Sequence, residues 1–153
     1  MQEVSVVIPN FNGRAYLDGV LSSLERQTIR NFEVILVDNG STDGSCAFVS
    51  AEYPWVHMIQ LPENYGFSRA VNEGIRAARS PYVLLLNNDT EAEPDFLEEM
   101  VAALRRHKKA FSCQAKMIQL HDRDKMDDAG NYYCALGWAF ARGKGKDIRH
   151  YDR

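Results

Sequence analysis

Four short polar side chains follow an apolar run near the middle of the chain. The apolar stretch 82–86 (YVLLL) is followed directly by Asn87, Asn88, Asp89 and Thr90. A carboxylate among amide and hydroxyl oxygens is a set of hard donors, and such donors bind Mg²⁺ or Mn²⁺ together with the phosphates of a ligand. The pattern therefore indicates a divalent-cation site with Asp89 as its charged ligand.

Two other apolar runs end in the same way. The run 4–9 leads into Pro9-Asn10-Phe11-Asn12, and the run 32–37 leads into Asp38-Asn39-Gly40-Ser41. Each cluster alone also fits ordinary turn chemistry, because Asn, Asp and Gly are common in loops. Three such clusters would meet at one edge if the runs are parallel strands of one sheet, since ligands bind outside the carboxyl ends of such strands.

The elements that must position these residues alternate along the chain. Strands in the predicted sheet are continuous apolar runs, as expected for a parallel sheet covered on both faces. Apolar spacing between the strands predicts amphipathic helices. We expect buried strands at 4–9, 32–37, 56–61, 82–86 and 110–119, and helices around 17–24, from Ser41 or Asp43 to Tyr53, at 66–79 and at 93–107.

Composition excludes several classes of protein. The chain has 153 residues and a net charge of -3, which gives no general attraction to nucleic acid. No apolar run approaches the roughly 18–20 residues that span a membrane, and the first residues lack the pattern of a signal peptide. Three well-separated cysteines suggest neither disulfides nor zinc, so we expect a reducing cytoplasm.

Several familiar site motifs are missing from the sequence. It contains no GxGxxG after the first strand, no GxxxxGK[ST], no GxSxG and no HExxH. What remains is a set of amides, a few carboxylates and Phe11, whose ring could give a nucleobase a flat apolar face.

Four segments together resemble the family 2 glycosyltransferases. They are VSVVIPNFNG, QTIRNFEVILVDNGSTDGS, ENYGFSRAVNEGI and YVLLLNNDT, and the resemblance runs from about residue 4 to 117. It implies the GT-A fold, with a mostly parallel, Rossmann-like sheet and helices on both faces. The LLNNDT variant is similar to the branch that contains rhamnosyltransferases and galactofuranosyltransferases of bacterial cell-surface polysaccharides.

The resemblance also implies roles for individual residues. Pro9 and Phe11 would line the nucleobase pocket, and Asp38 and Asn39 would hydrogen-bond the base. Asn39 stands where the family often has a second Asp, so the base stays open. The implied nucleotide-binding set is Pro9, Asn10, Phe11, Asp38, Asn39, Arg69, Asn87 and Asn88, with Asp89 as the ligand of Mg²⁺ or Mn²⁺.

Simpler interpretations stay open for some of these residues. Phe11 could cap the core, Arg69 could be a solvated helix residue instead of reaching the base edge or the diphosphate, and Asn88 could only shape the turn. Asn87 replaces an acid of the family's DxD-like motif and could bond to ribose. Asp127-Asp128 fits a polar turn better than a catalytic pair.

The implied reaction is an inverting transfer from a UDP- or dTDP-linked sugar to a glycan or lipid-linked acceptor. We expect residues 1–119 to form the GT-A core that binds the donor, and residues 120–153 to be a polar, flexible continuation towards an acceptor-binding half outside this sequence. No acidic motif after Asp89 matches the family's catalytic base, so we expect the base beyond residue 153 and no sugar transfer by this chain alone. Peripheral attachment to the inner face of the membrane would then also come from that half.

Two alternatives belong to other classes. The chain could be a nucleotide-sugar-binding module without catalysis. It could also be a receiver-like signalling domain, but that would require acids after the first strand, where Pro9 and Asn10 stand.

Overall fold

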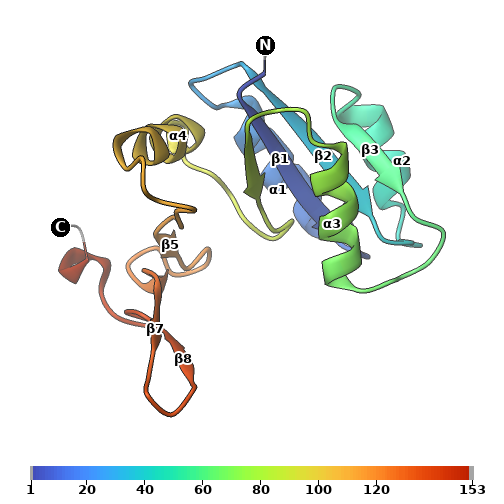
Figure 1. Cartoon of the computed structure of the whole chain (residues 1–153). Helices are drawn as coiled ribbons and strands as arrows, with labels where there is room; N and C mark the ends of the chain where they lie inside the picture. The colour runs from blue at the N-terminus through green and yellow to red at the C-terminus, as the bar shows by residue number, and fades with distance from the viewer. Residues whose placement is uncertain (1, 152–153) are drawn as a thin grey trace. The chain divides into compact units, whose positions relative to one another are not determined.

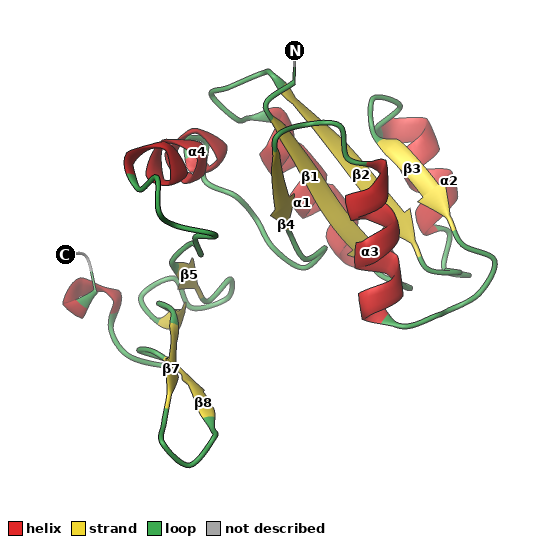
Figure 2. Ribbon diagram, viewed as in Figure 1, coloured by secondary structure: helices red, strands yellow, loops and turns green. Residues whose placement is uncertain are grey.

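The computed structural model describes residues 2–151, which form two compact units that divide between Glu99 and Met100. The two units are described separately below. Figure 1 labels helices and strands of both units, and Figure 2 adds the label of β4. The first unit holds β1 (Val4–Asn10), α1 (Arg14–Glu25), β2 (Phe32–Asp38), α2 (Ser45–Glu52), β3 (His57–Gln60), α3 (Phe67–Ala77) and β4 (Tyr82–Leu85), and α4 (Phe96–Arg106) spans the division.

The four strands of the first unit form one parallel sheet in the order β3-β2-β1-β4. The inner strands carry the core: in β1 and β2 the apolar side chains from Val6 to Ile8 and from Val34 to Val37 are almost completely buried. The register pairs Asn10 with Asp38, so the polar residues that end these two strands are neighbours. The prediction of a parallel sheet built on the runs 4–9 and 32–37 is confirmed.

Helices cover both faces of this sheet, as Figure 2 shows, with α3 on one face and α1 on the other. The predicted apolar stripe of α1, Leu17, Val20, Leu21 and Leu24, is fully buried. Helix α3 instead packs through small residues. A Cβ atom at Gly74 would lie 2.3 Å from Val7 Cγ1, so glycine allows the helix to approach β1 closely.

Strand β4 differs from the prediction of a buried strand. Its side chains alternate in exposure, and Val83 and Leu85 are 42% and 51% exposed. They are in register with Ser5 and Val7 of β1, and therefore point to the face that α3 covers. Helix α3 packs mainly over β1 and β2, and Val83 and Leu85 therefore stay about half exposed.

The second unit corrects one prediction. The stretch 110–119 does not add a fifth parallel strand, because only β5 (Met117–Ile118) forms there, and it pairs antiparallel with β6 (Met126–Asp128). The residues that follow form the β7 (Asn131–Tyr133) and β8 (Ala139–Ala141) hairpin and a short 3₁₀ helix, Ile148–His150.

Candidate functional site

Side chains from three strand ends meet at one edge of the sheet. Asn10 Nδ2 donates to Asp38 Oδ1 over 2.9 Å, and Asn88 Nδ2 donates to Asn10 Oδ1 over 2.8 Å. The ends of β1, β2 and the segment after β4 are therefore joined by one row of hydrogen bonds. This confirms the prediction that the three polar clusters share an edge.

The close approach of Asn10 and Asn88 depends on Gly13, the residue that precedes α1. A Cβ atom at this position would lie 2.0 Å from Asn88 Nδ2 and 2.5 Å from Asn10 Oδ1. Because real Cβ atoms do not approach other atoms so closely, any other residue would displace one of the two amides.

The β1–α1 and β2–α2 loops hold each other through side chains. Ser41 Oγ accepts hydrogen bonds from Asn10 Nδ2 and from the Asn12 amide, and Asn12 Oδ1 accepts from the Thr42 amide. Asn12 has a φ of 50°, a left-handed conformation that Asn tolerates better than most residues. The loops thus form one connected rim.

Asp43 completes this rim. It accepts hydrogen bonds from the Arg14 amide and from both the amide and the hydroxyl of Ser45. Burial alone would raise the pKa of Asp43, but these hydrogen bonds outweigh it and hold the pKa below the ordinary value. The predicted helix start near Asp43 is thereby explained, although Gly44 is the residue at the N-cap.

Asn39 anchors a fourth segment, the loop that leads into α3. Its side-chain nitrogen donates to Asn64 Oδ1 over 2.8 Å and to the carbonyl of Gly66, and its oxygen accepts from the Tyr65 amide. Asn39 is 3% exposed, so these bonds are largely shielded from water. The segment 64–66 is therefore fixed against the end of β2.

A pocket of about 400 Å³ opens between these segments. This volume lies within the range of about 300–1,000 Å³ that is usual for small-ligand sites. Most of the predicted nucleotide-binding residues contribute to it. The pocket is lined by Pro9, Asn10, Phe11, Asn39, Asn64, Gly66, Phe67, Ala70, Asn87, Asn88 and Asp89.

Asp38 does not line the pocket. It is 2% exposed, and its two oxygens accept from Asn10 Nδ2 and from the Ser41 amide. A further neighbour is Cys46, whose thiol has its pKa raised to about 11 by burial and by the proximity of the Asp38 carboxylate. In this structure Asp38 orders the two loops, and its contact with a base stays a prediction.

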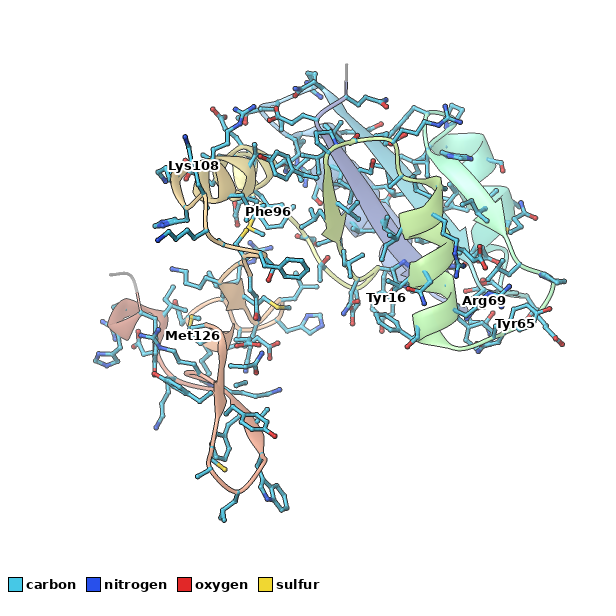
Figure 3. The ribbon with its side chains drawn as sticks, viewed as in Figure 1. Tyr16, Tyr65, Arg69, Phe96, Lys108 and Met126 are labelled. Carbon is cyan, nitrogen blue, oxygen red and sulfur yellow. The ribbon has the colours of Figure 1, made fainter. Side chains whose placement is uncertain are left out.

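Arg69 also lies outside the pocket lining. Its guanidinium donates to Glu73 one helical turn later and stands 5.6 Å from the centre of the Tyr65 ring. Figure 3 shows Arg69 and Tyr65 beside each other at the beginning of α3. A role for Arg69 towards the nucleotide stays a prediction.

Asp89 and Asn87 are exposed at the mouth of the pocket. Within residues 2–151, no group of three or more His, Cys, Asp or Glu side chains could hold a metal ion. Asp89 therefore fits a shared site only, in which one carboxylate and neighbouring amide oxygens bind a dication whose remaining ligands are phosphate oxygens and water.

Four pocket residues escaped the sequence prediction: Asn64, Gly66, Phe67 and Ala70. All four belong to the segment 63–70 (ENYGFSRA), in which the family resemblance assigns a role to Arg69 alone. Phe67, the first residue of α3, is 62% exposed at the pocket. The signal available in the sequence was an aromatic residue directly after a glycine.

Comparison with known proteins settles the family. The profile described as Glycosyl transferase family 2 matches residues 5–151. The chain belongs to this family. Membership removes the receiver-like alternative. It also confirms the resemblance that the four segments indicated.

The chain matches only part of the length of its individual relatives. The chain is 30% identical over 128 residues to TuaG of Bacillus subtilis, named for teichuronic acid biosynthesis; the match covers 81% of this chain and 50% of TuaG. The chain thus spans half or less of the length of the curated relatives that it matches.

Solved structures confirm the GT-A fold. S. aureus TarS in complex with UDP-GlcNAc aligns with a TM-score of 0.65 at 23% identity, covering 77% of this chain and 38% of that one. A mannosyltransferase from Pyrobaculum calidifontis, in complex with GDP-Man and Mn²⁺, aligns with a TM-score of 0.61 at 25% identity, covering 67% and 32%. Among residues 2–151 of the present chain, no helix is both long and apolar enough to cross a membrane.

Proposed function

We propose that the pocket binds a nucleoside-diphosphate sugar, and that the chain is the donor-binding part of an inverting glycosyltransferase of cell-surface polysaccharide synthesis. The observation that carries the proposal is the row of hydrogen bonds from Asn88 through Asn10 to Asp38, which holds three strand ends around one pocket. The donor would be UDP- or dTDP-linked, and the acceptor a glycan or a lipid-linked sugar.

The base would occupy the part of the pocket near Pro9 and Phe11. Phe11 is 47% exposed, so its ring is available for stacking, and stacking depends little on which base is present. The Asn39 side chain is fully engaged with the 64–66 segment. Its proposed role is therefore to shape the wall of the base site, and Asn87 is the better candidate for contact with ribose.

The diphosphate would lie at the mouth of the pocket, beside Asp89. There Asp89 would hold Mg²⁺ or Mn²⁺ with the phosphate oxygens, as the donor set allows. The metal, when bound, would neutralise charge that grows on the leaving diphosphate. Asp89 is the one carboxylate among the eleven described residues that line this pocket, so the group that takes the acceptor proton would come from outside it.

The ligands of two similar solved structures support this proposal. TarS was solved with UDP-GlcNAc, and the Pyrobaculum enzyme with GDP-Man and Mn²⁺. Both share the fold, so a nucleotide sugar and a dication are reasonable ligands for the same sheet edge. The polysaccharide context is supported by the name of TuaG.

The test is calorimetric titration of UDP, dTDP and GDP into the chain, with Mn²⁺ and with EDTA. Asp89→Ala should weaken nucleotide binding in Mn²⁺ by roughly 10–100-fold, which corresponds to about 1.4–2.8 kcal/mol, and should leave binding in EDTA unchanged. Phe11→Ala should weaken binding in both conditions, because it acts on the base.

Glu52→Ala is the matched control, since Glu52 is an exposed carboxylate at the end of α2 and outside the pocket lining. It removes the same charge and should bind nucleotide as the parent does. If Asp89→Ala binds normally in Mn²⁺ but melts well below the parent, Asp89 is a structural residue and the metal assignment is wrong.

A further inference from the structure

The β7–β8 hairpin is the most apolar exposed feature of the second unit. Residues 131–141 (NYYCALGWAFA) contain no charged side chain, in a protein in which 25% of residues are charged. Five large apolar side chains lie on it and are between 55% and 85% exposed: Tyr132, Tyr133, Leu136, Trp138 and Phe140. Exposed apolar surface that is gathered in one place marks an interaction site.

The apolar side chains point to both faces of the hairpin. Tyr132 pairs across the strands with Phe140, and Tyr133 pairs with Ala139. Because successive side chains of a strand alternate between faces, Tyr132 and Tyr133 point in opposite directions. A single protein surface would cover one face and leave the other in water, whereas a fluid apolar medium would cover both.

Basic residues follow the hairpin immediately. Arg142, Lys144, Lys146 and Arg149 are exposed within residues 142–150, where Asp147 is the one acid. This segment has a charge of +3, four bases less one acid, in a chain whose net charge is -3. The Asp127 carboxylate lies 3.7 Å from Lys144 Nζ and lowers the local charge to +2. The hairpin thus combines an apolar, aromatic tip with a positively charged segment at its foot. This combination matches the interface of a membrane with anionic lipids, where Trp and Tyr side chains concentrate.

The hairpin is held at its base. Arg142 exchanges backbone hydrogen bonds with Ala129 and Gly130, and Lys146 accepts from the amide of Met126, which is fully buried. Figure 1 shows the two strands running from this region of the unit to a turn. The tip around Leu136 is therefore presented on a fixed stem.

We propose that the β7–β8 hairpin inserts its tip into the interface of an anionic membrane, with Arg142, Lys144 and Lys146 at the level of the headgroups. Each strand has three residues and a length of about 10 Å, comparable with the 5–10 Å depth that interfacial segments reach. Deeper insertion is disfavoured, because the outer edges of a two-stranded hairpin carry unpaired backbone groups. The inference is independent of the proposed donor site.

The test uses the fluorescence of Trp138 in the 153-residue chain. The chain has two tryptophans, so Trp55→Phe leaves Trp138 as the reporter. Vesicles of phosphatidylglycerol and phosphatidylethanolamine should shift its emission to shorter wavelength and should pellet the protein. Vesicles of phosphatidylcholine alone should bind less, and added salt should weaken the binding to anionic vesicles.

Leu136→Asp, at the turn, should reduce vesicle binding by roughly tenfold or more. Its melting temperature should stay unchanged, because Leu136 is 85% exposed. Phe111→Asp is the matched control: Phe111 is fully exposed and lies outside the hairpin, so its replacement adds the same charge without an effect on binding.

Three results would overturn the proposal. The first is failure of the parent to bind anionic vesicles, and the second is equal loss of binding in Leu136→Asp and Phe111→Asp. The third is a Trp138 emission that is already at short wavelength and shielded from acrylamide without vesicles, which would show that a protein surface covers the hairpin.

Discussion

Replacement of Gly13 by alanine is the sharpest test of how the pocket is held together. The new methyl group would occupy the place where Asn88 Nδ2 and Asn10 Oδ1 meet. The 2.8 Å hydrogen bond between these atoms would then have to break or lengthen, and Asn88 would move into the pocket that it lines.

Three effects set the change in the free energy of unfolding of Gly13→Ala. Gly13 has φ -103° and ψ 22°, which alanine also adopts, so the smaller entropy of the unfolded chain should stabilise the variant by about 0.4–1 kcal/mol. Overpacking costs about 1–3 kcal/mol, and a lost hydrogen bond costs about 0.5–1.5 kcal/mol. We expect the free energy of unfolding to fall by roughly 0.5–4 kcal/mol.

Urea denaturation of the parent, Gly13→Ala, Asn88→Ala and the double variant measures this effect. Removing the Asn88 side chain relieves the closer of the two contacts and leaves the one with Asn10 Oδ1, so Gly13→Ala should cost less in the Asn88→Ala background, by about 0.5–3 kcal/mol. Gly19→Ala in α1 is the control. Its Cβ atom would lie 3.3 Å from the carboxylate of Glu91, the end of a flexible side chain, and a helical Gly→Ala change should stabilise by about 0.5–1 kcal/mol.

The steric reasoning is refuted if Gly13→Ala unfolds at the same or a higher urea concentration than the parent. It is also refuted if the cost of Gly13→Ala is the same with and without the Asn88 side chain.

Two further predictions concern the loops. Asn39→Ala should release the 64–66 segment, because it removes the bonds to Asn64, Tyr65 and Gly66; amide exchange of Tyr65 should then accelerate, and unchanged protection would contradict this. Asp43→Asn should lower the melting temperature at pH 7. The low folded pKa of Asp43 gives stability that is fully present above its unfolded pKa and is lost as the pH falls through the folded pKa. The difference between parent and variant should therefore shrink in acid below about pH 4, and a difference that grows there would show that the sign is wrong.

The sheet could be predicted where local pattern and burial coincide. The runs 4–9 and 32–37 are long and β-branched, and both became inner strands. Part of the run 110–119 is also apolar, but only Met117 and Ile118 form a strand there, and they do so by antiparallel pairing with the segment 126–128. Apolar residues alone therefore could not tell a fifth parallel strand from a two-residue bridge.

The sequence predicted which residues gather at one edge of the sheet, but it did not predict the hydrogen bonds that each of them makes. Placing Asn10, Asp38 and Asn88 together required only that the strands be parallel. That both Asp38 oxygens are occupied by Asn10 and Ser41 depends on how two loops fold against each other. Such pairings between distant loops have no periodic signature in the sequence.

The strand order has a consequence for synthesis of the protein. β1 ends at Asn10, yet one of its two neighbours in the sheet, β4, begins only at Tyr82. At about 5–20 residues per second, the apolar edge of β1 would wait roughly 4–15 seconds for that partner. During this time one edge of β1 has no partner strand, and the Val and Ile side chains of β1 are not fully covered. The nascent chain is then a substrate for chaperones that bind extended apolar segments.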